Sequence, residues 1–145
     1  MDNAHEVLRR IAADGGLVEV VAHGTSWSDW NTLVHRLRSE GFGTRLTREG
    51  DEIALEVTSN IFSESSDISY TLTVEIGRQI WTSAFFEQSS IDLQCDGATI
   101  RTIDDLGNVY RLMKVMWEVA RTRVILVPET IYPELVQPWI VIEAP

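Results

Sequence analysis

The chain has 145 residues and a net charge of −10, with 22 acidic side chains against 12 basic ones. This length fits a single domain with one hydrophobic core, and the 44% apolar fraction is ordinary for a globular protein. The charge excludes a protein that binds nucleic-acid phosphates through a basic surface. It permits attraction to a basic partner, although solubility alone also explains it.

The composition also bears on location. The N-terminal segment has an acidic residue at position 2 and no long apolar stretch, so no secretory signal is predicted. No apolar run approaches the roughly 20 residues of a membrane-spanning helix. The single cysteine, Cys95, excludes an intrachain disulfide and a multi-cysteine metal site. Lys114 is the only lysine among the basic residues, a bias that suggests a GC-rich bacterial genome. We expect a cytoplasmic protein with one domain over residues 1–145 and no membrane contact.

Two helices are predicted in the first 41 residues. Asn3 and Glu6 fit a capping box for a short helix that ends at Gly15, and residues 17–22 predict a strand. A second helix is predicted to begin near residues 28 and 29. Its apolar stripe follows the i, i+3, i+4, i+7 pattern and consists of Trp30, Leu33, Val34 and Leu37.

The firmest prediction is a hairpin over residues 68–86, in which apolar and polar residues alternate. Gly77 and Arg78 suit a type II′ turn, because glycine accepts a positive φ at the first central position. This turn pairs Val74 with Trp81, Leu72 with Ser83 and Tyr70 with Phe85.

Two further hairpins are predicted by the same register argument. A turn at Gly50 and Asp51 places Leu46 opposite Leu55, Thr44 opposite Val57 and Arg45 opposite Glu56. A turn at Asp96 and Gly97 places Leu93 opposite Ile100 and Asp92 opposite Arg101. The three hairpins together predict six consecutive antiparallel strands.

The remaining elements complete the predicted fold. Residues 60–67 are polar and acidic and predict a flexible loop. Thr102 and Asp105 fit a capping box that opens the longest helix, roughly residues 104–122, and residues 124–127 predict a last strand. The proline-rich tail cannot form a regular helix, and its apolar residues predict that it packs back on the domain. The fold class is therefore α+β: a six-stranded antiparallel meander sheet, with N-terminal helices and one long C-terminal helix packed on one face.

No residue pattern predicts catalysis. Cys95 alternates with Ile91 and Leu93, as a small buried hydrophobe would, and no neighbouring base would lower its pKa. His23 opens a turn before a helix, where backbone N–H groups could hold an anion, but serine and threonine at such a place usually cap the helix. The three histidines lack metal-ligand spacing. We predict no catalytic residue, no metal, no cofactor and no enzyme activity.

Aromatic and acidic residues outside the predicted core are the candidates for binding a partner. Trp27 does not join the stripe of the second helix, and Trp139 lies in the proline-rich tail. Aromatic residues of this kind often anchor protein interfaces. The acids Glu64 and Asp67 lie in the predicted loop, where they would steer a basic partner. The predicted partner-binding residues are therefore Trp27, Glu64, Asp67 and Trp139.

One stretch carries a family resemblance: DWNTLVHRLRSEGFGTRLTREGDEIALEV. Its amphipathic helix, Gly-Phe-Gly stop and acid-flanked hairpin, in a small acidic chain without a catalytic motif, resemble the immunity proteins of bacterial polymorphic-toxin systems. The resemblance implies an antitoxin function, in which a charged surface with aromatic residues binds a cognate toxin tightly and covers its active site.

Two other classes stay open. A small acidic secretion chaperone or scaffold protein also has helices on a twisted sheet, and it usually dimerises. Its interface would be an apolar patch of Ile80, Ala84 and Phe86, which lie on the other face of the predicted hairpin over residues 68–86. An enzyme or small-ligand binder would need a pocket that the sequence does not indicate.

Overall fold

The computed structural model describes residues 3–130 and 132–145, which form four α-helices and eight β-strands. The helices are α1 (Ala4–Asp14), α2 (Trp27–Ser39), α3 (Ser59–Glu64) and α4 (Ile103–Ala120). The strands are β1 (Leu17–His23), β2 (Gly43–Arg48), β3 (Asp51–Ile53), β4 (Tyr70–Ile76), β5 (Gln79–Ser83), β6 (Ser90–Asp96), β7 (Val124–Pro128) and β8 (Ile140–Ile142). Two 3₁₀ turns, η1 (Gly97–Thr99) and η2 (Pro133–Leu135), complete the described elements.

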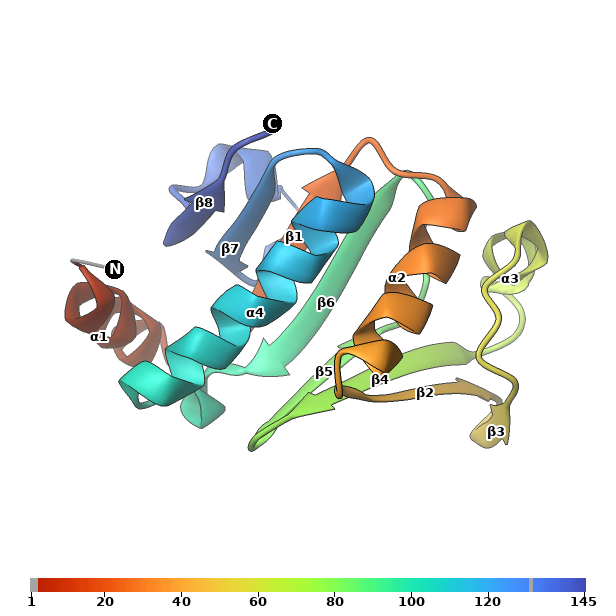
Figure 1. The fold of residues 1–145 in the computed structure, drawn as a ribbon, viewed down its shortest axis with the longest axis horizontal. Coiled ribbons are helices and arrows are strands. Elements are labelled where there is room, and N and C mark those ends of the chain that lie inside the picture. The colour runs from red at the N-terminus through yellow and green to blue at the C-terminus, as the bar shows by residue number, and fades with distance from the viewer. Residues whose placement is uncertain (1–2, 131) are drawn as a thin grey trace.

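The strands form one antiparallel sheet in the order β3-β2-β4-β5-β6-β1-β7-β8 (Figure 1). The predicted α+β class is confirmed, but the six-stranded meander is wrong. Strand β1 comes first in the sequence, yet it lies between β6 and β7 in the sheet. Five of its seven residues in succession are buried, which is the pattern of an inner strand covered on both faces.

The Gly77 hairpin is confirmed. Val74 lies opposite Trp81 and Leu72 opposite Ser83. Gly77 has a φ of 56°, whereas Arg78 has no positive φ, as a type II′ turn requires. The expected pairing of Tyr70 with Phe85 is wrong, because β5 ends at Ser83 and Phe85 leaves the strand with a φ of 58°.

The hairpin at Gly50 has a different register from the predicted one. Glu49 and Gly50 are its two turn residues, both with positive φ, which is the type I′ pattern. Leu46 consequently lies opposite Ile53 instead of Leu55. Strand β3 ends at Ile53, so the predicted pairs of Thr44 and Arg45 with residues 57 and 56 do not form, and Arg45 instead contacts Glu75.

The hairpin predicted at Asp96 is wrong. The Asp96 carboxylate accepts a hydrogen bond from the Ala98 N–H at 2.9 Å and so caps η1, which leads the chain toward α4. Strand β6 pairs over its whole length with β1, and Asp92 therefore lies opposite Val21 instead of Arg101.

The helices follow the sequence closely, with two exceptions. Capping boxes at Ser26 and Thr102 begin α2 and α4, and the long predicted helix is confirmed. Asn3 makes no side-chain cap to α1, contrary to the prediction. The loop predicted over residues 60–67 is wrong in its first half, because residues 59–64 form α3, in which Ile61 is buried.

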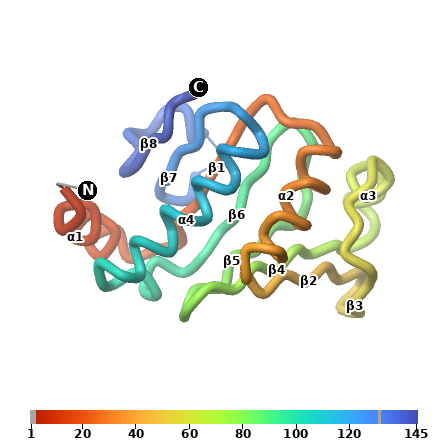
Figure 2. The backbone as a smooth tube through the Cα atoms, in the orientation of Figure 1, coloured from red at the N-terminus to blue at the C-terminus, as the bar shows by residue number. Residues whose placement is uncertain are grey.

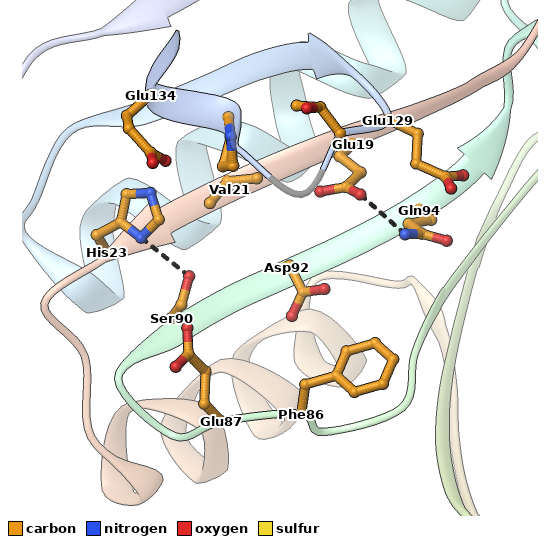
Figure 3. Close-up of a pocket in the computed structure, with 12 residues that line it drawn as sticks. Glu19, Val21, His23, Phe86, Glu87, Ser90, Asp92, Gln94, Glu129 and Glu134 are labelled. Carbon is orange, nitrogen blue, oxygen red and sulfur yellow. Dashed lines mark hydrogen bonds between the residues drawn. The ribbon is translucent and has the colours of Figure 1, made fainter.

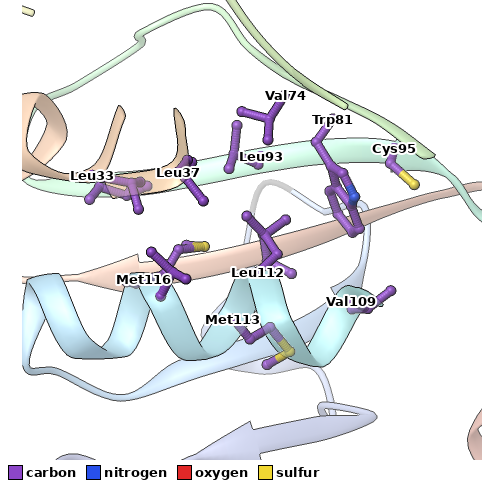
Figure 4. Packing of buried hydrophobic residues seen from close by; sticks show 14 of the residues in the cluster. Leu33, Leu37, Val74, Trp81, Leu93, Cys95, Val109, Leu112, Met113 and Met116 are labelled. Atoms are coloured by element: carbon purple, nitrogen blue, oxygen red, sulfur yellow. The ribbon is translucent and has the colours of Figure 1, made fainter. Parts of the chain in front are cut away.

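One face of the sheet carries the helices and the main core. Figures 1 and 2 show α2 and α4 lying across this face, with α1 beside α4. The stripe of α2 is fully buried, as predicted, and meets the core residues of α4 and the sheet (Figure 4). Among the labelled core residues are Leu33, Leu37, Val74, Trp81, Leu93, Cys95, Leu112 and Met116.

On the opposite face of the sheet, here called the open face, none of the α-helices of the described residues lies across the centre (Figure 1). Part of it is covered by the chain that follows β7, where Val136 packs on Val21, Ile125 and Val127. The tail then returns as β8, beside β7, which confirms that it packs back on the domain. None of the helices in the described residues is long and apolar enough to cross a membrane.

Candidate functional site

A cleft of about 660 Å³ lies on the open face of the sheet, and we call it the acidic cleft (Figure 3). Its floor comes from β1 and β6, and its sides come from the loop before β6 and the segment after β7. The described residues that line it are Glu19, Val21, His23, Phe86, Glu87, Ser90, Asp92, Gln94, Glu129, Thr130, Pro133 and Glu134.

The alternation of β1 and β6 places polar residues on this floor. In both strands every second residue enters the main core, so the residues between them face the cleft. The antiparallel register then sets Glu19 opposite Gln94, and His23 opposite Ser90. Glu19 and Asp92 are diagonal neighbours, because Asp92 lies two residues from Gln94.

The charge of the cleft is one-sided. Five carboxylates line it, from Glu19, Glu87, Asp92, Glu129 and Glu134, and the described lining residues include no lysine or arginine. Like charges so close together repel one another, and a cation brought between them would relieve this repulsion. The cleft is therefore built to attract a positively charged group.

Glu19 is the most deeply placed of these acids, with only 6% of its surface exposed. Gln94 Nε2 donates a hydrogen bond to its Oε1 at 2.8 Å, and no other described residue donates to its carboxylate. Burial raises the pKa of Glu19, and the nearby Asp92 and Glu129 carboxylates raise it further, against the opposing effect of the Gln94 hydrogen bond.

Asp92 is half-buried in the middle of the cleft (Figure 3). Burial raises its pKa as well, and repulsion from Glu87 adds to the effect, while its own backbone N–H and His23 act in the opposite direction. No other described residue donates a hydrogen bond to the Asp92 side chain. Its charge is thus held in a partly desolvated place, and no lysine or arginine lies among the described lining residues to pair with it.

Ser90 and His23 also meet in this cleft, with 3.1 Å between the serine hydroxyl and Nδ1 of the ring. In a Ser-His-Asp hydrolase the acid accepts a hydrogen bond from the second ring nitrogen. No described carboxylate does so here. The contact is explained by the strand register, which places the two residues opposite each other.

The other chemically reactive residues do not form a site. Cys95 is buried among core residues, and burial raises the pKa of its thiol to about 11, so the reactive thiolate is disfavoured. Within residues 3–130 and 132–145, no three histidine, cysteine, aspartate or glutamate residues are grouped so as to hold a metal ion. The polar side chains of the turn after His23 have structural contacts, since Ser26 caps α2 and the Thr25 hydroxyl donates to the Gln88 carbonyl oxygen in the loop before β6.

The four predicted partner-binding residues do not gather in one place. Trp27 is 40% exposed at the start of α2. Its backbone N–H donates to the side-chain oxygen of Gln88, the residue that follows Glu87 of the cleft. Asp67 is exposed in a small hollow that shares Phe86 with the acidic cleft. These two residues therefore lie near the cleft, on its outer side.

Glu64 and Trp139 are occupied by contacts within the molecule. The Tyr70 hydroxyl donates to the Glu64 carboxylate at 2.6 Å. Trp139 lies just before β8, at the end of the molecule far from α3, and its half-buried side chain packs against the main core (Figure 1). The backbone N–H of Trp139 donates to the Leu126 carbonyl oxygen at 2.8 Å.

Sequence reasoning missed the acids of the cleft floor. Glu19 is the only charged residue in the otherwise apolar stretch from Leu17 to Ala22, and an acid inside a buried strand was the signal that could have indicated it. Asp92 was given Arg101 as a partner through the incorrect hairpin. Neither residue could be placed in a common site before β1 was known to pair with β6.

Comparison with known proteins adds no relative: no family model, no curated protein and no solved structure matches this chain.

Proposed function

We propose that this protein is a non-enzymatic protein-binding protein, an immunity protein that binds and neutralises a basic bacterial toxin through the acidic cleft. The observation that carries the proposal is the set of five carboxylates around the cleft, with no lysine or arginine among its described lining residues. Together with the net charge of −10, this favours a basic partner and fast, electrostatically steered association.

Exposed apolar side chains beside the acids favour a protein as the partner. Phe86 lines the cleft with 75% of its surface exposed, and Leu135 is 77% exposed directly after the cleft residue Glu134. Acids flanked by exposed aromatic and aliphatic side chains are typical of protein interfaces, where the apolar groups supply affinity and the charges supply specificity. Trp27 and Asp67 extend the proposed interface beyond the cleft.

The proposal is tested with the toxin-bearing protein encoded next to this chain in its native genome. Cells that produce this toxin are expected to grow only when they also produce the present protein. The purified pair should form a stoichiometric complex in isothermal titration calorimetry. The double variant Glu19→Gln with Asp92→Asn should lose both effects, whereas Glu52→Gln, which removes an exposed acid from β3, should keep them. Growth rescue that is equally strong with the double variant would contradict a role for the cleft.

The runner-up is a small secretion chaperone or scaffold protein that dimerises. It is favoured by Ile80, Ala84 and Phe86, which are all exposed, as the alternation of the hairpin predicts. Ile80, for example, is 56% exposed on β5. Sedimentation equilibrium decides between the two: a dimer that Ile80→Asp dissociates would support the chaperone or scaffold function, and a monomer at all concentrations would remove it.

A further inference from the structure

We propose that the acidic cleft receives an arginine side chain of the protein partner, with the guanidinium between Glu19 and Asp92 and the aliphatic stem against Phe86. This inference rests on the proposed function in one respect, because it takes the ligand to be part of a protein. It goes further by naming the group that the cleft recognises and the residues that bind it.

The spacing of the two acids suits a group bound between them. Glu19 and Asp92 come from adjacent antiparallel strands and are diagonal neighbours on the same face of the sheet. In such a pair the Cα atoms lie about 7–8 Å apart, which long side chains bridge and which leaves room for a group between the two carboxylates. A planar guanidinium carries five N–H donors and can donate toward both sides at once.

No lysine or arginine among the described lining residues neutralises Glu19 and Asp92. Only 6% of the Glu19 surface is exposed. Among the described residues, only Gln94 donates a hydrogen bond to its carboxylate, and it does so to one of the two oxygens. Asp92 receives no hydrogen bond from another described residue. Burial raises the pKa of both groups, and nearby carboxylates add to the effect: Asp92 and Glu129 for Glu19, and Glu87 for Asp92. A bound cation would shift both pKa values in the opposite direction. Two partly desolvated carboxylates without a lysine or arginine among the described lining residues can thus bind a cationic group from a partner.

Among cationic groups, arginine fits the cleft better than a metal ion or lysine. A metal ion needs several ligands at short range, and the described residues contain no group of three that could supply them. A lysine ammonium is a compact, strongly hydrated charge that would have to lose its water at the floor. Arginine is more weakly hydrated, and it stacks on aromatic rings such as that of Phe86, which lines the same cleft. The cleft volume of about 660 Å³ leaves room for the whole side chain.

The acids at the sides of the cleft have a separate part in this proposal. Glu87 comes from the loop before β6, and Glu129 and Glu134 come from the segment after β7. They lie around the floor and add negative potential over the opening, which steers a cationic side chain inward. His23 is the one lining residue that could oppose them, and its ring is in contact with Ser90.

The test is a ¹H-¹⁵N NMR titration of the whole protein with N-acetyl-arginine methylamide. Saturable shifts are expected for the amides of β1 and β6 that surround Glu19 and Asp92, and for the side-chain amide of Gln94. N-acetyl-citrulline methylamide, which has nearly the same shape without the charge, should cause none. N-acetyl-lysine methylamide should bind several-fold more weakly.

Variants locate the binding. Glu19→Gln and Asp92→Asn should each weaken binding of the arginine probe about tenfold, as the loss of a charged hydrogen-bonding group does. Glu52→Gln removes the same charge from an exposed position on β3 and should leave it unchanged. A dispersed NMR spectrum of each variant shows that it is folded. Equal shifts with citrulline, or arginine shifts that spread over other acidic surfaces, would overturn the proposal.

The outcome is separable from that of the proposed function. Growth rescue without arginine binding in the cleft would overturn this inference alone. Arginine binding by a protein that rescues cells from no neighbouring toxin would overturn the immunity function and leave the recognition chemistry of the cleft in place.

Discussion

Glu19 shows at the scale of one residue how binding chemistry and stability can conflict. An ionised carboxylate in a buried strand loses most of its hydration, and the single hydrogen bond from Gln94 replaces only part of it. Because its pKa is raised in the folded protein, the proton is held more tightly there than in the unfolded chain. The ionised form therefore destabilises the fold, and a cationic partner would remove this penalty on binding.

The first prediction follows from the sign of this shift. As the pH rises through the interval between the unfolded and the raised folded pKa of Glu19, wild-type stability falls, and above the interval the loss is complete. Glu19→Gln cannot ionise, so it should be more stable than wild type at pH 7, with the difference vanishing below about pH 4, near the ordinary glutamate pKa. Urea unfolding at both pH values measures the difference. Asp105, whose pKa is lowered by backbone hydrogen bonds, affects wild type and variant alike and cancels.

Glu52→Gln is the matched control, since Glu52 is exposed on β3. It should change stability by less than about 0.5 kcal/mol, as surface substitutions usually do. A Glu19→Gln variant that is less stable than wild type at pH 7 would show that the ionised carboxylate stabilises the fold.

At the scale of elements, sequence signals predicted helix starts and tight turns correctly when the feature depended on neighbouring residues alone. They failed when a residue also contacted a part of the chain far away in the sequence. The capping box of α4 and the Gly77 turn were predicted correctly, because each depends on residues within one short stretch. Asp96 and Gly97 carry an equally strong hairpin signal, but Gly97 contacts Gly16, which is far away in the sequence. Its N–H donates to the Gly16 carbonyl oxygen at 3.1 Å.

A pair of glycine substitutions tests this reading of Gly97. A Cβ atom at Gly97 would lie 2.8 Å from the Gly16 carbonyl oxygen, so Gly97→Ala must displace backbone and should destabilise the protein by roughly 1–3 kcal/mol. A Cβ atom at Gly107, inside α4, would meet nothing within 4 Å. Gly107→Ala should therefore stabilise the protein by up to about 1 kcal/mol, the difference in helix propensity.

Thermal or urea unfolding of both glycine variants measures these effects. The two substitutions add the same methyl group, so their opposite signs would be due to the surroundings alone. A Gly97→Ala variant as stable as wild type would show that the contact between Gly16 and Gly97 relaxes without cost.

At the scale of the whole molecule, the sheet consists of two halves. Strand β1 pairs over seven residues with β6 and over five with β7, whereas β5 pairs with β6 only through Thr82 and Gln94. The helix α4 belongs to the same core cluster as residues from both halves, such as Trp81 of β5 and Leu93 of β6 (Figure 4). The cleft belongs to the half with the continuous ladders, so its floor is held on the more regular part of the sheet.

This division predicts a pattern of native-state hydrogen exchange. The amides of β1 have a continuous ladder on both sides and should exchange only through global unfolding. The amides of β5 that point away from β4 should exchange faster, through local opening at the seam. Exchange followed by NMR at several low denaturant concentrations measures both. Equal exchange free energies for β1 and these β5 amides would indicate that side-chain packing alone makes the two halves one cooperative unit.

The candidate site could not be predicted from the sequence for a related reason. Its floor consists of β1 and β6, which are about 70 residues apart in the chain and joined only by long-range pairing. The alternation of each strand was readable, and it correctly indicated which residues of β6 enter the core. Which two strands share an edge depends on the whole sheet, so the acids of the cleft could not be assembled from local patterns.

The last prediction concerns association with the toxin that the immunity function requires. Raising the salt concentration from about 0.05 to 0.5 M shortens the Debye length from roughly 14 to 4 Å, and should slow association by about tenfold or more. Asp67→Asn and Glu64→Gln should each lower the association rate modestly and leave dissociation nearly unchanged, since both act through long-range charge. Trp27→Ala should instead raise the dissociation rate, by about tenfold if the exposed indole anchors the interface. Stopped-flow and surface-binding kinetics separate the two rates. An association rate indifferent to salt would contradict the electrostatic part of the proposal, because five carboxylates around one cleft cannot attract a basic protein without a dependence on screening.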